Sequence, residues 1–153
     1  MQGKTRRAGQ AYRGGEFHHP LAARRGEARE RTAGDQPDQV HPFIDQDKVI
    51  AVCRGYGLAV TAYCPLARGK VPGNEVLARI GKTRGKSAAQ VALRYLVQQG
   101  IVTIPRTPNP DHLAANLAVF DFKLSHAEMV EIDKLKQGGM RVVNPPHAPR
   151  WDN

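Results

Sequence analysis

Apolar and polar residues alternate with helical spacing in two segments of the chain, and each segment opens on a capping box. Ser87 to Gln90 and Ser125 to Glu128 both have the Ser-x-x-Gln/Glu pattern, in which the two side chains bond reciprocally to backbone N–H groups of the first turn. Gly100 ends the first segment and Gly138-Gly139 the second. The pattern predicts two amphipathic helices, with inward residues Ala88, Val91, Ala92, Tyr95 and Leu96 in the first and Met129, Ile132 and Leu135 in the second.

Two short runs have the composition of buried strands. Leu58 to Tyr63 is apolar on both faces apart from Thr61, and Cys64-Pro65 stops it. Ile101 to Ile104 is β-branched and ends at Pro105, which cannot donate to a sheet ladder. Strands that are apolar on both faces are typical of parallel sheets covered by helices.

Three further helices are expected at cap signals. Asp45 or Asp47 can cap the first, Asn74 the second, and Asn109 or Asp111 the third. The inward faces would be Val49, Ile50 and Cys53 for the first and Leu113, Leu117 and Phe120 for the third. The order helix, strand, helix, strand, helix predicts a parallel α/β fold.

Residues 1–40 lack the side chains that build a core. They contain one Leu, one Val, no Ile and six Gly, together with Arg-rich runs. Such a segment cannot bury enough apolar area to offset its ordering entropy. We therefore expect a disordered basic tail over residues 1–40, a folded segment over 41–136, and a Pro-rich C-terminal tail without a core pattern over 137–153.

Length and composition exclude several classes of protein. A chain of 153 residues can bury one ordinary core, so one domain is expected. No run is apolar enough to span a membrane, and no apolar segment follows the basic N-terminus as in a signal peptide, so we expect a cytoplasmic protein with no membrane partner. Cys53 and Cys64 form neither a disulfide framework nor a zinc pattern, and no metal site is expected.

The formal net charge of +9 is spread along the chain. Residues 1–40 hold eight Lys or Arg against five acidic residues, and residues 41–153 hold fifteen against nine. No block is purely basic, and no aromatic residues are interleaved to stack on bases, so no nucleic-acid partner is expected. An anionic cofactor would explain part of the excess.

The stretch from Ile101 to Asn116 has the features of an anion site. Arg106 and Thr107 follow the predicted strand, and the next helix would direct its unpaired N–H groups and positive dipole end towards the same space. On spacing alone, an ordinary loop with a solvated Arg106 is the more common interpretation.

The same stretch resembles the cofactor signature of the aldo-keto reductases. In that signature I-P-K-S, then an Arg, then Glu-Asn grip the adenosine 2′-phosphate and adenine of NADPH. By position Arg106 matches the Lys, Thr107 the Ser, His112 the Arg, Ala115 the Glu and Asn116 the Asn. His112 carries a full charge only below neutral pH, and Ala115 has no acceptor, so the resemblance implies NADP(H) or NAD(H) without deciding between them.

A second motif carries the same resemblance. A-Y-C-P-L-A-R-G is similar to the family's A-Y-S-P-L-x-x-G, in which the Tyr stacks on the nicotinamide ring and the Ser-Pro-Leu turn borders the pyrophosphate. The resemblance assigns these roles to Tyr63, Cys64 and Leu66, and leaves Arg68 able to reach a phosphate. Without it, Tyr63 would more often be a core aromatic residue.

The resemblance covers roughly residues 41–136 and implies the C-terminal part of a (β/α)8 TIM barrel, too short to be complete. The implied reaction is reduction of an aldehyde or ketone, the small-molecule substrate, by hydride from NAD(P)H. In the family the catalytic Asp, Tyr, Lys and His precede this part, so no catalytic residue is assigned, His41 is expected to be structural, and the chain alone should be a poor enzyme. In the family the C-terminal tail lies over the substrate mouth, where Trp151 could contact substrate; the other interpretation is a terminal Trp that packs on nothing. The rival hypothesis is a non-catalytic α/β nucleotide- or protein-binding module with a basic disordered tail.

A second interpretation of the N-terminal segment comes from the codon table. Read one nucleotide later, Gln10 to His19 permits K-H-I-G-V-A-N-F-T-T, which resembles the family strand K-H-I-G-V-S-N-F. Residues 34–38, G-D-Q-P-D, permit A-T-N-Q-I, which resembles the family strand T-N-Q-V-E before His41-Pro42. We hypothesise that residues 1–38 are an out-of-frame translation of barrel sequence. The coding DNA, translated in the next frame, should then read G-V-A-N-F or G-V-S-N-F upstream, and any other string there would refute the hypothesis.

Overall fold

The computed structural model describes residues 35–137, 140–143 and 146, with side chains from residue 38 onward. Three strands, five α-helices and two short 3-10 helices, labelled η, lie along this part of the chain. Their order is β1 (Asp35–Gln39), α2 (Asp47–Gly55), β2 (Ala59–Tyr63), η1 (Ala67–Gly69), α3 (Glu75–Thr83), α4 (Ala88–Gln98), β3 (Val102–Thr103), α5 (Pro110–Leu117), η2 (Ala118–Phe120) and α6 (His126–Asp133). No helix in these ranges is long and apolar enough to cross a membrane.

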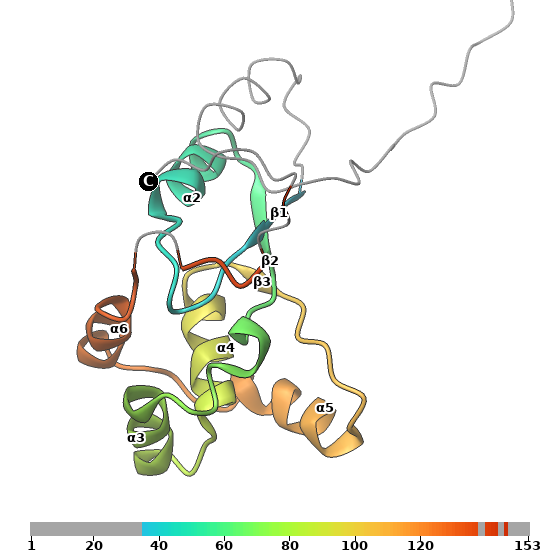
Figure 1. The fold of residues 1–153 in the computed structure, drawn as a ribbon. Helices are drawn as coiled ribbons and strands as arrows, with labels where there is room; N and C mark the ends of the chain where they lie inside the picture. Colours follow the sequence, from blue (N-terminus) through green and yellow to red (C-terminus); the bar gives the residue numbers. More distant parts are fainter. Residues whose placement is uncertain (1–34, 138–139, 144–145, 147–153) are drawn as a thin grey trace, which may run out of the picture.

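The three strands form one parallel sheet in the order β1-β2-β3. Pro37 lies opposite Thr61, and Ala62 lies opposite Thr103. Figure 1 shows the helices around this short sheet, with α4 below it and α3, α5 and α6 further out. The predicted parallel α/β order is confirmed.

The helix starts follow the local signals closely. Ser87 and Ser125 both form complete capping boxes, and the Asn74 side chain accepts from Leu77 N at 3.0 Å, as predicted. Of the two candidates for α5, Asn109 is the N-cap, and its Oδ1 accepts from Asp111 N at 2.9 Å.

The predicted carboxylate cap of α2 is wrong. The N-cap is Gln46, which makes no side-chain cap bond. Its side chain turns inward instead and donates to Gln39 O and Asp38 Oδ1, each at 3.4 Å. Asp45 Oδ1 accepts from Asp47 N just before the helix.

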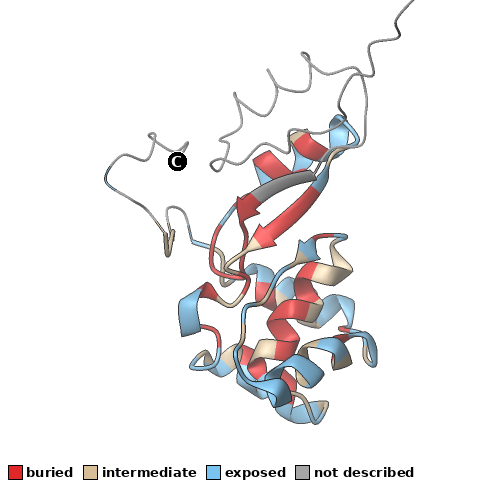
Figure 2. Cartoon of the chain, turned by 90° about the vertical axis from the view of Figure 1, so that its right-hand side faces the viewer, coloured by how far each residue is buried: buried red, intermediate tan, exposed pale blue. Residues whose placement is uncertain are grey.

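The core lies between the sheet and the helices that cover it. Figure 2 shows buried residues concentrated on β1, β2 and the inner side of α4. The predicted inward faces of α2 and α4 are buried, and Ile132 of α6 is fully buried with Met129 and Leu135 partly buried beside it. Helical spacing therefore identified most of this core.

One predicted inward face is not buried. Leu113, Leu117 and Phe120 have exposed fractions of 58%, 67% and 66%. No residue of α5 is buried. The main contacts of α5 with other elements are to α4 and η2, and its apolar side chains on the opposite side stay exposed.

Strand β1 lies inside the segment 1–40 for which the composition predicts disorder. Pairing with β2 orders it, and its last two residues, Asp38 and Gln39, are fully buried. The two interpretations of the N-terminal segment, disorder and out-of-frame translation of barrel sequence, stay predictions. Residues 1–34, the predicted helix end at Gly138-Gly139, and Trp151 lie outside the described residues.

The Gln39 side chain joins the end of β1 to the C-terminal segment. Its Oε1 accepts from Val142 N at 2.5 Å and Val143 N at 3.3 Å, and its Nε2 donates to Val143 O at 3.1 Å. One buried amide thus satisfies three backbone groups that are about a hundred residues away in the sequence.

Replacing Gln39 with Leu should release residues 140–143. Leu offers neither a donor nor an acceptor, and each buried backbone group left without a partner costs about 1–3 kcal/mol unless it moves into water. We expect faster tryptic cleavage after Arg141 and a loss of about 1–2 kcal/mol in urea unfolding. Equal cleavage rates in the variant and the parent chain would contradict this role.

A second polar network ties α4 to α6 and α2. The buried Tyr95 hydroxyl donates to Asp133 Oδ1, and Lys136 Nζ lies 2.8 Å from both Asp133 Oδ1 and Asp47 Oδ1. Burial and the bond to Asp133 raise the pKa of Tyr95. Burial disfavours the ionised form of Asp133, but the bonds from Lys136 and Tyr95 outweigh it, and the Asp133 pKa is lowered.

Candidate functional site

The loop after β3 is held by its own side chains. Asn109 N donates to Thr107 Oγ1 at 3.1 Å, and Thr107 Oγ1 lies 3.4 Å from His112 Nδ1. Pro110 occupies the first turn of α5, where its missing N–H is not needed. The loop thereby places Thr107 and the first turn of α5 on the same side as His112.

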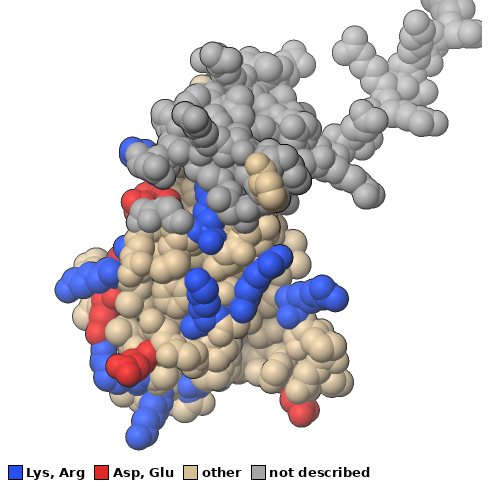
Figure 3. Space-filling model, viewed as in Figure 1, with Lys and Arg blue, Asp and Glu red and all other residues tan. Residues whose placement is uncertain are grey.

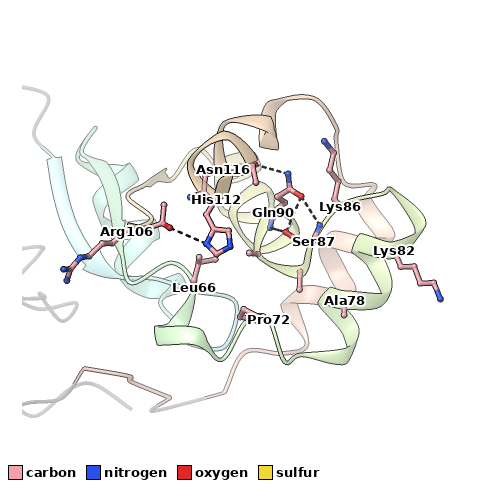
Figure 4. A pocket seen from close by; sticks show the side chains of 14 residues that line it. Leu66, Pro72, Ala78, Lys82, Lys86, Ser87, Gln90, Arg106, His112 and Asn116 are labelled. Carbon is pink, nitrogen blue, oxygen red and sulfur yellow. Dashed lines mark hydrogen bonds between the residues drawn. The ribbon is translucent and has the colours of Figure 1, made fainter. Parts of the chain in front are cut away.

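The turn after β2 has an unusual backbone. Cys64, Ala67 and Arg68 have positive φ values of 54°, 49° and 50°. Residues other than glycine seldom adopt this left-handed conformation, which costs about 1–2 kcal/mol each, and such strain tends to occur at functional sites. The turn directs Leu66 towards the loop after β3 (Figure 4).

A cavity of about 660 Å³ lies between the β2 turn, the α3–α4 connection and α5. Figure 4 shows its lining side chains, with His112, Gln90 and Leu66 facing the same space and the Arg106 guanidinium extending outward. The lining residues are Leu66, Pro72, Ala78, Lys82, Lys86, Ser87, Ala88, Ala89, Gln90, Arg106, Thr107, His112, Ala115 and Asn116.

The wall of the cavity on the α4 side is braced by Gln90. Its Oε1 accepts from Ser87 N at 2.9 Å within the capping box, and its Nε2 donates to Ala115 O of α5 at 2.9 Å. The capping-box pattern identified Ser87 and Gln90 only as a helix start. The bond to Ala115 depends on tertiary packing and has no signal in the sequence.

The charge around the cavity is positive. None of its lining residues is acidic, and three of them are Lys or Arg. Lys86 is held in place, since its Nζ donates to Ala118 O, lies 3.8 Å from Asp121 Oδ2 and sits 5.4 Å from the centre of the Phe122 ring. Arg106 is exposed at the rim. This distribution favours an anionic ligand.

The structure brings together some of the predicted site residues and not others. Of the eight predicted cofactor-binding residues, five line the cavity: Leu66, Arg106, Thr107, His112 and Asn116. Tyr63 and Cys64 are half-buried and Arg68 is exposed, all on the β2 turn and outside the lining. Sequence reasoning missed the site role of Lys82, Lys86, Gln90 and the small residues of the α3–α4 wall, because no motif links any of them to a ligand.

His41 and Cys53 are buried titratable side chains away from the cavity. His41 Nδ1 accepts from Phe43 N, and burial, with a smaller effect of Lys70, lowers the His41 pKa to about 4. Burial and, less strongly, the nearby Asp38 carboxyl together raise the pKa of Cys53 to about 11. Among the described residues, no group of three or more His, Cys, Asp or Glu side chains could hold a metal ion. His41 therefore has the surroundings of a structural residue in the core.

Comparison with known proteins finds a family model and relatives that agree with one another. Residues 38–137 match the model of the aldo/keto reductase family. The chain is 38% identical to aldose reductase B of Dictyostelium discoideum over 70% of this chain and 35% of the relative. It is 37% identical to the glyoxal reductase of Bacillus subtilis over 70% of this chain and 39% of the relative.

Solved structures agree in fold. A Gox0644 variant in complex with NADPH superposes with a TM-score of 0.80 at 25% identity, covering 89% of this chain and 50% of that one. MGS-M4, an aldo-keto reductase from a deep-sea metagenome library, gives a TM-score of 0.64 at 28% identity over 67% and 39%. The chain spans only 35–39% of these two curated relatives and about half of the NADPH-bound one. By its family match, its relatives and its TIM-barrel neighbours, this chain belongs to the aldo/keto reductase family.

Proposed function

We propose that the chain forms the adenosine end of an NADP(H) or NAD(H) site in an enzyme that reduces aldehydes and ketones to alcohols. One observation carries the proposal: Arg106, Thr107, His112 and Asn116, which match the family's cofactor signature, all line one cavity. The NADPH-bound structural neighbour supports the same class of cofactor.

The cavity fits this cofactor in size and chemistry. Its volume lies within the range of about 300–1,000 Å³ that is usual for small-molecule sites. The small apolar residues of the α4 wall suit a purine ring, and Arg106 with the first turn of α5 suits a phosphate. The residues present therefore accommodate an adenosine phosphate.

The family resemblance indicates which residues would contact each part of the cofactor. Arg106, Thr107 and His112 would hold the 2′-phosphate, and Asn116 the adenine. Tyr63, Cys64, Leu66 and Arg68 on the β2 turn would face the nicotinamide and pyrophosphate. The bound cofactor supplies the hydride, and a small-molecule carbonyl compound is the substrate class.

Neither Tyr95 nor His41, two buried titratable side chains of the core, is suited to protonate the carbonyl oxygen. A catalytic tyrosine needs a lowered pKa and access to substrate, whereas the Tyr95 hydroxyl is buried, bonded to Asp133 and raised in pKa. His41 is buried with a lowered pKa. We therefore propose that this chain keeps part of the cofactor site, and that the catalytic Asp, Tyr, Lys and His of the family belong to a part of the enzyme that this chain does not span. The chain alone then reduces aldehydes far more slowly than its relatives.

Arg106→Ala should weaken NADPH binding by about tenfold or more and leave NADH binding nearly unchanged. A charge-assisted hydrogen bond to phosphate is worth about 1.5–3 kcal/mol, and only NADPH carries the 2′-phosphate. Dissociation constants measured by cofactor fluorescence with both dinucleotides would check this.

Lys48→Ala is the control, because Lys48 is an exposed cation on α2, away from the cavity. It removes the same unit of charge and should change neither affinity. Equal losses for Arg106→Ala and Lys48→Ala, or no NADPH binding by the parent chain, would contradict the proposed site.

The alternative function is a non-catalytic nucleotide- or protein-binding module. The net charge of +9 is the observation that favours it. Figure 3 shows Lys and Arg side chains at several separate places on one face rather than in one block. Salt-sensitive binding to nucleic acid or an acidic protein, lost on deletion of residues 1–40, would support this alternative.

A further inference from the structure

Helix α5 forms one wall of the cavity although none of its own residues is buried. It carries His112 and Asn116, two of the side chains that match the cofactor signature and line the cavity. Its main contacts with other elements are to α4 and η2. The position of α5 against α4 therefore sets the width of the cavity where a ligand would lie.

A hydrogen bond joins α5 directly to α4. Gln90 Nε2 donates to Ala115 O at 2.9 Å. Ala115 is in the last turn of α5, where backbone carbonyls lack partners within the helix. Because Ala115 directly precedes Asn116 and lies almost one turn after His112, this bond holds the backbone between the two cavity-lining side chains.

The Gln90 amide is held in one orientation at the cavity wall. Its Oε1 accepts from Ser87 N at 2.9 Å within the capping box, and only 9% of Gln90 is exposed. Since the oxygen is taken up by Ser87, the Nε2 end is directed to Ala115, as the dashed lines of Figure 4 show. The Gln90 side chain thus links the start of α4 to the last turn of α5.

The capping box of α6 shows what the amide adds. There the same position is Glu128, whose carboxylate accepts from Ser125 N at 2.7 Å. Capping needs only an acceptor, and an acidic residue in the first turn also interacts favourably with the helix dipole. Gln90 lacks that advantage but has a donor, which a carboxylate does not have. Ala115 O is the group that uses this donor.

We propose that Gln90 is a positioning residue of the cavity, acting through Ala115 to hold His112 and Asn116 at the separation from α4 that a bound dinucleotide needs. The inference rests on the proposed function, because it requires a cofactor in the cavity. Its expected effect differs from that of a 2′-phosphate contact. Asn116 would hold the adenine, which NADP+ and NAD+ share, so loss of the Gln90 bond should weaken the binding of both.

Gln90→Met should weaken the binding of both NADP+ and NAD+ to the full chain by about tenfold or more, measured by isothermal titration calorimetry. Met is uncharged and similar in size, but it cannot donate to Ala115 O. Without this bond α5 must be ordered when the ligand binds, and the ordering lowers affinity. Ser125→Ala is the control, because it breaks the capping box of α6 outside the cavity lining. It should lower stability and leave both dissociation constants unchanged.

Gln90→Glu separates the bond to Ala115 from the capping box. Glu keeps the acceptor for Ser87 N, as Glu128 does for Ser125, so α4 keeps its start. At pH 8 the carboxylate cannot donate to Ala115 O, and NADP+ should bind about tenfold or more weakly than to the parent chain. At pH 5 the protonated acid, which burial favours, can donate, and affinity should recover to within about threefold of the parent chain.

The other charged groups of the cavity do not disturb this comparison. The charged or titratable side chains of its lining are Lys82, Lys86, Arg106 and His112, and variant and parent chain share them. The ratio of the two dissociation constants at each pH therefore removes their effect and that of the ligand phosphates. Gln90→Met has no titratable group and should show no recovery at pH 5, which separates a lost donor from repulsion between a carboxylate and phosphate.

The inference would be overturned by a Gln90→Met variant that binds both dinucleotides as well as the parent chain, by an equal loss in Ser125→Ala, or by a Gln90→Glu variant that stays weak at pH 5. Circular dichroism shows whether each variant folds, and Gln90→Glu gives the test if Gln90→Met does not. A parent chain that binds neither dinucleotide would refute the proposed function and the inference together. Binding that requires Arg106 but not Gln90 would refute the inference alone.

Discussion

Replacing Asp38 with Val should raise the free energy of unfolding by about 4 kcal/mol at pH 8. Asp38 is fully buried, its Oδ2 has no hydrogen-bond partner, and its Oδ1 accepts from Gln39 N at 2.7 Å. Burial raises its pKa from 3.8 to about 7, against a smaller opposing effect of the Gln39 bond. A difference of one unit between the pKa of a group in the folded and in the unfolded chain changes the free energy of unfolding by about 1.4 kcal/mol. Ionised Asp38 therefore lowers the free energy of unfolding by about 4 kcal/mol.

The pH dependence follows from the raised pKa. Between pH 3.8 and about 7 the folded chain holds a proton on Asp38 that the unfolded chain has lost. The contribution of Asp38 to stability therefore falls as pH rises through this window and is constant above it. Buried His41, whose pKa is lowered to about 4, contributes in the opposite direction between pH 4 and 6.5, so the Asp38 slope is read as the difference between variant and parent chain in urea unfolding from pH 4 to 8. Asp38→Val should remove this Asp38 slope.

Two controls separate charge from packing. Asp38→Asn removes the charge but keeps a buried polar group, so it should remove the slope and recover less stability than Asp38→Val. Asp121→Asn, at an exposed aspartate, should leave the slope intact. An unchanged slope in Asp38→Val would refute the assignment.

Glu128→Ala should lower the free energy of unfolding by about 2 kcal/mol at pH 7. Glu128 receives two bonds from Arg84, at 2.8 and 2.6 Å, and closes the capping box through Ser125 N at 2.7 Å. The Arg84 bond, with help from Ser125, lowers the Glu128 pKa from 4.5 to about 2. The lowered Glu128 pKa by itself would correspond to more than about 2 kcal/mol of stability. We expect only about 2 kcal/mol because the Arg84 and Glu128 side chains are partly exposed and solvent screens their interaction.

The pH dependence of Glu128 has the opposite sign. Its stabilisation is present above pH 4.5 and is lost as pH falls towards 2. The matched control is Glu131→Ala, because the Arg79–Glu131 pair is more exposed and should contribute less than 1 kcal/mol. Equal losses for the two variants, measured by urea unfolding, would show that the capping box and paired Arg84 add nothing.

Asp38 also bears on the reading-frame hypothesis. A buried carboxylate without a full set of partners is rare in a strand, and the shifted frame permits Ile at this position. The structure thus makes Asp38 an unfavourable residue at the position where the hypothesis expects an apolar one. Translation of the coding DNA remains the direct test.

Local signals were sufficient for most helix starts. Asn74, Ser87 and Ser125 cap their helices as predicted, because a capping bond joins residues only three apart. The α2 cap was mispredicted, since Gln46 turns to Gln39 and Asp38 through contacts between elements. For the candidate site, spacing and family resemblance named the loop residues, while the Gln90 brace to Ala115 and the lysines of the opposite wall could not be read from any motif.

The sequence by itself determined the order of strands and helices from α2 onward, the parallel α/β class and the family resemblance, because periodicity, caps and short motifs depend on neighbouring residues. Only the tertiary structure decided that Arg106, Thr107, His112 and Asn116 share one cavity, that Asp38 is buried and that the stripe on α5 is exposed. Each of these depends on which distant elements pack together. An apolar stripe on a helix predicts that a partner surface is needed, but only packing decides whether the described chain supplies it.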